Sequence, residues 1–403
     1  MYNSLWFKAH WVAGVFLGLF LIIIGFSGAV LSYQKEILRL INPASHTVVA
    51  NGEMMSPTQI VDSYIAKNSD AKINSIMLYS DATSSAVINV AVEGERRGKS
   101  IYINPYSGEV LPDVVGRDFF MFFFKLHRWL ALEGEMTAIG KQISAIATIA
   151  IIFLAISGIV INWARIRRGF LDSLKFSFKS KNRVFLSTMH SALGMWAAPA
   201  LLIISLSGLY WSYDWYRDAM YSVVGVEKPQ RFNKPAPQTA EKSEKSKDGM
   251  RGERGESTRG GERSGMRPMR DEAPQSYEMA DRLYETFKTN VSGGFKEVSL
   301  SLKSHDNHYD VRYLAADAPH FRATNSIEVD ATSFEILTHK KYSDKALNER
   351  IMSSMLPIHS GEYWGWIGQA LFFISSLLVV LFTITGYMLY FDRAKKKKAK
   401  AKS

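Results

Sequence analysis

Residues 187–211 read STMHSALGMWAAPALLIISLSGLYW, an apolar run with one histidine, His190, near its start and no charged side chain. About 20 such residues are enough to cross the hydrocarbon core of a bilayer as one helix. An ionisable side chain inside a membrane helix is rare and usually has a function. The stretch therefore predicts a membrane helix that carries a functional histidine.

Three further runs in the chain have the same character. The four candidate spans cover residues 11–33, 140–163, 190–213 and 364–391. Each run is long and nearly free of charge, which favours membrane spans over buried helices of a soluble protein. The first run lacks a small-residue cleavage site and is followed directly by charged residues, so we expect no cleaved signal peptide.

The formal net charge is +11, but the positions of the basic residues argue against nucleic-acid binding. They flank the spans: Lys8, Arg165, Arg167, Arg168, Lys175, Lys179, Lys181, Arg183 and the tail DRAKKKKAKAKS. Short flanks rich in Lys and Arg mark the cytoplasmic side of a membrane. Both termini and the loop at 164–183 are therefore predicted inside, and the long loops at about 35–125 and 214–355 outside.

Each outer loop has the pattern of a small α+β unit. In the first, SPTQIVDSYIAKN predicts a helix capped by Ser56, and KINSIMLYS, AVINVAVEG and KSIYINPYSGEVL predict strands. In the second, SYEMADRLYETFKTN predicts a helix, and FKEVSLSLKS, HYDVRYLAA and NSIEVDATSFEIL predict strands. A Gly-, Arg- and Glu-rich linker at 228–276 precedes the second unit, and we expect it to be disordered because it has too few apolar residues to bury a core.

The spans repeat as well, because His10 and Gly28 have the same spacing as His190 and Gly208. Small residues match between them: Gly14 with Gly194, Gly18 with Ala198, Gly25 with Ser205, and Ser27 with Ser207. These positions fall in one narrow arc of a helix. Such a stripe serves close helix packing or leaves room for a flat group, and the histidine on the same face favours the second. The pattern predicts a parallel internal duplication of span, outer unit and span.

Four of the nine histidines lie at the ends of spans. His10 and His190 lie at inside ends, whereas His127, in LHRWL, and His359, in PIHSG, lie at outside ends. A neutral imidazole is a strong ligand of haem iron, and two imidazoles from facing helices can clamp one porphyrin. We therefore expect two haem groups with axial pairs His10/His190 and His127/His359. They would be b-type, because covalent attachment requires cysteine and the chain has none.

Three other roles compete with haem ligation for these four histidines. A proton relay would add Asp or Glu within the spans, which contain none. A non-haem metal site would require carboxylate or thiolate partners. A purely structural role is the commonest fate of one isolated histidine, although four matched positions argue against it. The other five, His46, His305, His308, His320 and His339, are expected at the surface.

Further residues are candidates for contacts with a cofactor or an acceptor. The small residues expected to pack against haem are Gly14, Gly18, Gly194 and Ala198. Lys125 and Arg128 are candidates for pairing with haem propionates or an anionic substrate, or mark the lipid headgroup region. Trp129 and Trp364 line an acceptor site or belong to an interfacial aromatic belt.

The histidine-glycine spans, LHRWL, PIHSG and the strand YINPYSGEVL together resemble the PepSY-associated transmembrane family. Its members include bacterial inner-membrane ferric-siderophore reductases and iron-regulated membrane proteins. The resemblance covers nearly the whole chain except the linker. It implies a membrane α-helical fold, a bundle of four transmembrane helices with two periplasmic α+β PepSY-type domains, and haem b held by the four histidines named above.

This resemblance gives a segment-by-segment organisation. The predicted segments are transmembrane helix 1 (1–34), PepSY-like domain 1 (35–117), a pre-helix with transmembrane helix 2 (118–163), a cytoplasmic basic loop (164–185), transmembrane helix 3 (186–214), a periplasmic start with the linker (215–276), PepSY-like domain 2 (277–350), a pre-helix with transmembrane helix 4 (351–392) and a cytoplasmic basic tail (393–403).

The expected function is a di-haem b oxidoreductase of the bacterial inner membrane. It would pass electrons from quinol or a cytoplasmic flavoprotein to a periplasmic acceptor, with a ferric-siderophore favoured because ferrous iron is a softer, less charged ion that binds hard oxygen ligands less tightly. One alternative is a membrane-anchored PepSY module that binds proteins or regulates a peptidase without redox activity. A transporter is a third, weakened because the spans lack interruptions and central polar residues.

Overall fold

The computed structural model describes residues 2–93, 95–179, 182–228 and 277–400, so the predicted linker lies outside them from residue 229 onward. The helices are α1 (Tyr2–Ser32), α2 (Gln34–Ile41), α3 (Pro43–His46), α4 (Pro57–Ile65), α5 (Arg117–Trp129), α6 (Met136–Arg168), α7 (Phe170–Ser173), α8 (Asn182–Leu209), α9 (Asp214–Val224), α10 (Met279–Asn290), α11 (Leu347–Ser353), α12 (Met355–Ser360) and α13 (Gly365–Lys400), with 3-10 turns η1 (Tyr342–Asp344) and η2 (Glu362–Trp364). The strands are β1 (Ile73–Tyr79), β2 (Ala86–Val92), β3 (Glu95–Ile103), β4 (Phe295–Ser301), β5 (His308–Ala315), β6 (Thr324–Asp330) and β7 (Ile336–Lys340).

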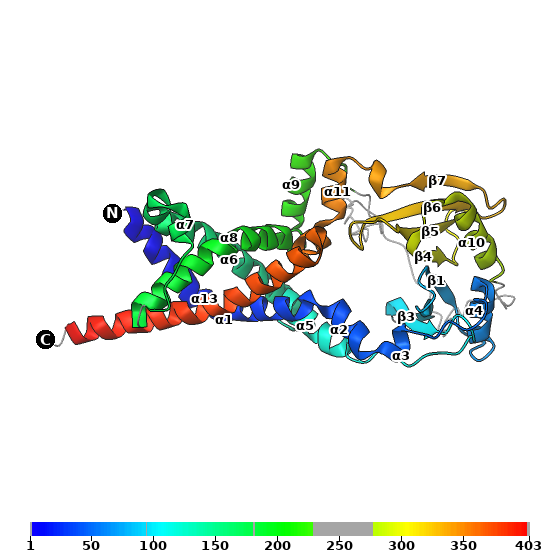
Figure 1. Cartoon of the computed structure of the whole chain (residues 1–403), viewed down its shortest axis with the longest axis horizontal. Helices are drawn as coiled ribbons and strands as arrows, with labels where there is room; N and C mark the ends of the chain where they lie inside the picture. Colours follow the sequence, from blue (N-terminus) through cyan, green and yellow to red (C-terminus); the bar gives the residue numbers. More distant parts are fainter. Residues whose placement is uncertain (1, 94, 180–181, 229–276, 401–403) are drawn as a thin grey trace, which may run out of the picture. The chain divides into compact units, whose positions relative to one another are not determined.

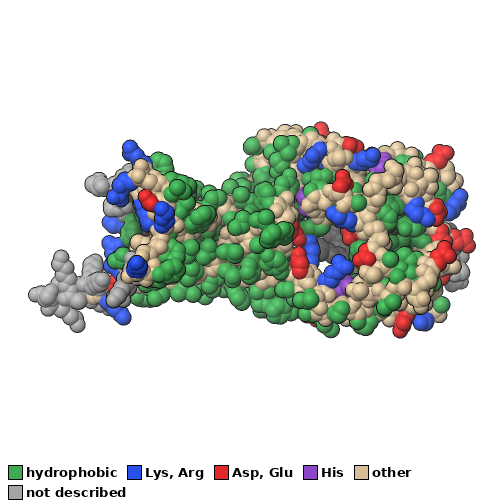
Figure 2. All heavy atoms as spheres, in the orientation of Figure 1, with side chains coloured by type: hydrophobic (Ala, Val, Ile, Leu, Met, Phe, Trp, Pro, Cys, Tyr) green, Lys and Arg blue, Asp and Glu red, His purple; other side chains and the backbone are tan. Residues whose placement is uncertain are grey.

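Four helices, α1, α6, α8 and α13, are long and apolar enough to cross a membrane. Their candidate spans are Leu5–Ser32, Met136–Arg168, Arg183–Leu209 and Glu362–Lys395. The four predicted spans are confirmed, except that the third ends at Leu209 rather than near residue 213. Figure 2 shows hydrophobic side chains covering the visible flank of these helices, and Phe16 is 76% exposed. Such a surface suits lipid, and a helix satisfies its own backbone there.

The four long helices form one bundle. Helix α1 packs against α6 and α13, and α8 packs against the same two helices, so α1 and α8 occupy opposite corners (Figure 1). The centre of the bundle is apolar, with Leu21, Ala147, Leu201 and Val379 buried together. Close approach requires small residues: a Cβ on Gly25 would lie 2.8 Å from the carbonyl oxygen of Ser376. Part of the small-residue stripe therefore serves helix packing.

The strands of both predicted α+β units pair in one seven-stranded sheet of order β3-β2-β1-β4-β5-β6-β7, antiparallel throughout. Strands β1 and β4 form the seam, where Ile76 lies opposite Leu300. One hydrophobic core serves both halves. The two predicted α+β units thus share one sheet and one core. Alone, β1 and β4 would each expose an edge of unpaired N–H and C=O groups, and their pairing removes both edges.

Helices α4 and α10 are joined across the same seam. Ser56 caps α4 in a capping box with Gln59, as predicted. Asp281 of α10 accepts hydrogen bonds from the Ser56 hydroxyl and the Thr58 backbone N–H, both at 2.8 Å. A carboxylate near a helix N-terminus is also favoured by the helix dipole. The two halves are therefore linked by helix contacts as well as by strands.

Because the core is shared, one substitution can test whether the two halves of the sheet unfold together. Leu300→Ala should lower the free energy of unfolding of the sheet by about 2–5 kcal/mol, because Leu300 is fully buried. Hydrogen exchange should then quicken in β2 as well as in β5. The matched change Leu337→Ala, at a 55% exposed position of β7, should have little effect. Faster exchange confined to β4–β7 would show that the halves unfold independently.

Candidate functional site

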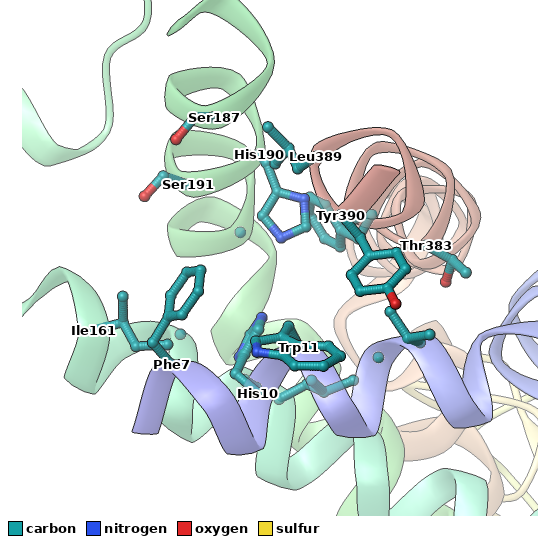
Figure 3. Close-up of a pocket in the computed structure, with 18 of the residues that line it drawn as sticks. Phe7, His10, Trp11, Ile161, Ser187, His190, Ser191, Thr383, Leu389 and Tyr390 are labelled. Carbon is teal, nitrogen blue, oxygen red and sulfur yellow. The ribbon is translucent and has the colours of Figure 1, made fainter. Parts of the chain in front are cut away.

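His10 of α1 and His190 of α8 face each other across the bundle (Figure 3). Their ring centroids are 6.4 Å apart and the rings are inclined by 74°. Both line a cavity of about 860 Å³, within the range of small-molecule sites. The sequence predicted this pair as one site, and the structure brings the two rings together.

A glycine from each of the four long helices lines this cavity: Gly14, Gly158, Gly194 and Gly386. A Cβ on Gly194 or Gly386 would meet nothing within 4 Å, and one on Gly14 would only touch Leu154 at 3.9 Å. Protein packing therefore does not require glycine at these positions. The absent side chains instead leave space beside the histidines for another group.

Hydroxyl groups orient both inner rings through Nδ1. His10 Nδ1 lies 2.7 Å from the Ser157 hydroxyl, and His190 Nδ1 lies 2.8 Å from that of Thr385. Each hydroxyl donates its own hydrogen to a carbonyl of its helix, that of Leu154 or Leu381. The hydroxyl oxygen therefore accepts from Nδ1–H. This network assigns the proton to Nδ1 and leaves the lone pair on Nε2.

The outer pair repeats this arrangement from short helices. His127 of α5 and His359 of α12 have ring centroids 6.2 Å apart, inclined by 57°. His127 Nδ1 lies 3.1 Å from the Ile24 carbonyl and 3.2 Å from the Ser27 hydroxyl. A carbonyl only accepts, so Nδ1 carries the proton here as well.

His359 makes the matching bonds on α8. Its Nδ1 lies 2.9 Å from the Ile204 carbonyl and 3.1 Å from the Ser207 hydroxyl. The adjoining glycine is needed, because a Cβ on Gly208 would lie 3.1 Å from His359 Cε1. The indole of Trp211 also contacts the ring, at 5.5 Å between centroids.

One dipeptide recurs at all four histidines: a hydroxyl residue followed by glycine. The pairs are Ser27-Gly28 for His127, Ser157-Gly158 for His10, Ser207-Gly208 for His359 and Thr385-Gly386 for His190. The sequence analysis identified Gly28 and Gly208 by their spacing and Ser27 and Ser207 as matched small residues, and it missed the hydroxyls as partners. The signal was present, because the dipeptide occurs once near the matching end of every span.

The other predicted packing residues divide into two groups. Gly14 and Gly194 line the inner cavity. Gly18 instead lies against the Tyr387 ring, where an added Cβ would come within 2.8 Å of the ring carbons. Ala198 is buried at 3% exposure outside the set of cavity-lining residues in the described chain. The latter two positions therefore serve helix packing.

The predicted contact residues differ in their relation to the outer pair. Arg128 is half-buried beside it, and its charge acts on both His127 and His359. Lys125 is 3.6 Å from Glu133 in an exposed ion pair. The Trp129 carbonyl packs against Gly140, where no Cβ would fit. Trp364 is 48% exposed and contacts Phe372 at 5.6 Å between ring centroids.

Comparison with known families finds one match that covers nearly the whole chain. The PepSY-associated TM region matches residues 7–393 of the chain.

The chain belongs to the PepSY-associated TM family. Its apolar helices and this membership make it a membrane protein that associates with the lipid bilayer. No curated protein matches the chain closely enough for comparison.

The paired histidines of this PepSY-associated TM protein would suit a haem held between two imidazoles. A metal–imidazole bond of about 2 Å places the centroids of two rings on opposite sides of one ion about 6 Å apart. Both pairs have this separation. No cluster of three or more His, Cys, Asp or Glu that could hold a metal occurs in the described part of the chain. Two protein ligands suffice where a macrocycle supplies the others.

One histidine expected at the surface is buried instead. His320 is 7% exposed, and its Nδ1 accepts from the Arg322 backbone N–H at 3.2 Å. Its Nε2 therefore carries the proton and lies 3.2 Å from the Tyr342 hydroxyl and 3.0 Å from that of Ser354. The expectation fails here because loop packing, which no local pattern encodes, encloses the ring.

The contrast between the two glycines of α8 can be tested on cofactor-free protein. Gly194→Ala should raise the free energy of unfolding by up to about 1 kcal/mol, because alanine favours the helix and the site has room. Gly208→Ala should lower it by about 1–3 kcal/mol, because the new methyl presses on His359. Thermal unfolding in detergent measures both. Equal effects of the two changes would contradict the assigned packing.

His320 should contribute a pH dependence of stability. Burial lowers the pKa of His320, and the nearby Glu362 carboxylate raises it by less. The unfolded state then binds a proton on His320 more readily than the native state does. The stability contributed by the neutral, buried ring is therefore present above about pH 6.5 and is lost as the pH falls. The melting temperature of the native protein should drop more steeply below that pH than that of His320→Gln. Parallel profiles would contradict this expectation.

Proposed function

We propose that this protein carries electrons across the bacterial inner membrane on two haem b groups, one at each histidine pair. The observation that carries the proposal is the recurrence of one ligand arrangement at both ends of a membrane helix bundle. Each pair has facing rings about 6 Å between centroids, with Nδ1 hydrogen-bonded and Nε2 left for iron. When bound, haem b supplies a one-electron centre.

The spacing between the pairs suits transfer across a bilayer. His10 and the outer contact Ser27 lie on the same helix, and 1.5 Å per residue separates them by about 25 Å along its axis. The hydrocarbon core is about 30 Å thick. The two pairs therefore lie near opposite membrane surfaces, in agreement with a parallel duplication of span, outer unit and span.

The residues packed between the pairs are largely apolar. A buried cluster there holds Leu21, Ile24, Ile151, Leu201 and Val379. The hydroxyls of Thr383 and Tyr387 in this region donate to backbone carbonyls, those of Val379 and Val15. A largely apolar centre favours electron transfer over a proton relay, because a relay requires a chain of polar groups.

The direction of electron transfer follows from the positions of the basic residues. Lys8, Arg183 and Arg393 lie at the end that holds His10 and His190, and these basic residues support a cytoplasmic location for that end and for both termini. The sheet would then lie in the periplasm. The inner pair would receive electrons from quinol or a cytoplasmic flavoprotein, and the outer pair would deliver them to a ferric-siderophore or another periplasmic acceptor.

Arg128 supports electron transfer from the inner pair to the outer pair. Its positive charge lies beside both outer histidines, within the partly buried end of α5. A fixed positive charge favours the more reduced state of a nearby centre, and the low dielectric of the site strengthens this effect. The same charge suits a haem propionate or an anionic chelate.

An optical spectrum tests the proposal directly. The purified protein, oxidised and then reduced with dithionite, should show low-spin b-type bands, and a haemochrome count should give two haems per chain. His10→Ala and His127→Ala should each lose one haem, because each removes one axial ligand of a different pair. The control His308→Ala, which alters a histidine of the sheet, should keep both.

Each other outcome is informative. A protein that stays colourless after haem is added would overturn the redox proposal and leave the PepSY region as a protein-binding or peptidase-regulating module. Loss of the same haem in both variants would contradict the two separate pairs.

A further inference from the structure

Three helices each contribute one cationic side chain to the rim of the inner cavity. Lys8 of α1, Arg183 of α8 and Arg393 of α13 all line it. Among the lining residues of the described chain there is no Asp or Glu. The deeper wall is apolar, with side chains such as Leu154 and Val379. The cavity therefore suits a ligand with an apolar body and an anionic end.

The three cations gather at one end of the cavity. Arg183 precedes His190 by two helical turns on the same face of α8, and Arg393 follows Gly386 by two turns on α13. Lys8 lies less than one turn before His10. All three are thus displaced from the histidines toward the cytoplasmic end.

The partners of these cations within the chain do not neutralise the rim. Arg183 lies 3.5 Å from Asp392, and both side chains are 40% exposed, so the pair is weak. The Arg393 guanidinium lies over the Phe7 ring at 5.1 Å from its centroid, which orients it without cancelling its charge. An excess of positive charge therefore remains at the rim.

We propose that Lys8, Arg183 and Arg393 bind the two propionate carboxylates of the inner haem and so fix its orientation, with the carboxylates facing the cytoplasm. This inference rests on the proposed function. Guanidinium groups bind carboxylates in bidentate geometry, and charge-assisted hydrogen bonds are about twice as strong as neutral ones. The histidines hold the iron, while the rim decides which edge of the macrocycle points out of the membrane.

The test combines a change in the protein with a change in the ligand. Full-length His127→Ala protein, which keeps only the inner site, is loaded with haem or with haem dimethyl ester, whose carboxylates are blocked. Dissociation into excess apomyoglobin is then timed. Esterification should speed loss about tenfold in this background, and Arg183→Gln with Arg393→Gln should do the same for unmodified haem. In the doubly substituted protein, esterification should add little, since one interaction is removed by both changes.

Matched controls separate the possible failures. Arg167→Gln removes a cytoplasmic cation outside the cavity and should leave both dissociation rates unchanged. The midpoint potential of the inner haem should become more negative in Arg183→Gln but not in Arg167→Gln, because the oxidised iron loses a repelling charge.

Two results would contradict the proposal that the rim binds the propionates. If the ester and the acid dissociate equally from the unsubstituted rim, the carboxylates are not bound there. If the variants retain haem unchanged but lose co-purified anionic phospholipid, the rim binds a lipid headgroup instead. Both results require a protein that still binds haem. A protein that takes up no haem would overturn the proposed function itself.

Discussion

A hydrogen bond from each imidazole Nδ1 to a hydroxyl beside a glycine is the interaction on which the rest of the site depends. The hydroxyls of Ser27, Ser157, Ser207 and Thr385 each accept it. The bond fixes the tautomer, so that Nε2 keeps its lone pair, and it fixes the ring plane. At the outer end the same bond docks a short helix, α5 or α12, onto a long one. The following glycine allows that approach, since a Cβ on Gly28 would lie 3.1 Å from His127 Cε1.

The membrane makes these bonds more consequential than they would be in water. With no solvent to satisfy a polar atom, an unpaired ring nitrogen in the bundle would cost free energy. Each hydroxyl is itself anchored by donating to a carbonyl of its own helix, as Ser207 does to Ile203 at 2.6 Å. A largely apolar layer then separates the two polar sites. The bundle is thus organised as two ligand-bearing ends and an insulating centre.

The sheet is connected to the outer histidines by polar contacts. His320, in the loop between β5 and β6, bonds to Tyr342 and to Ser354, which directly precedes the α12 helix of His359. The Lys35 ammonium, just after α1, lies 3.0 Å from the Glu362 carboxylate in η2. The first contact holds the loop between β5 and β6 against the start of α12, and the second joins α2 to η2.

The sequence by itself determined the four spans, the sorting of four histidines to the two ends and the small residues beside them. These features are local: hydropathy over some 20 residues, charge in short flanks and helical spacing depend only on neighbours in the chain. Tertiary structure alone decided that β1 pairs with β4, that His320 is buried, and that Gly18 packs on Tyr387 while Gly194 faces open space. A strand edge or a hydroxyl has many chemically equivalent partners, and only the packing of distant segments selects one of them.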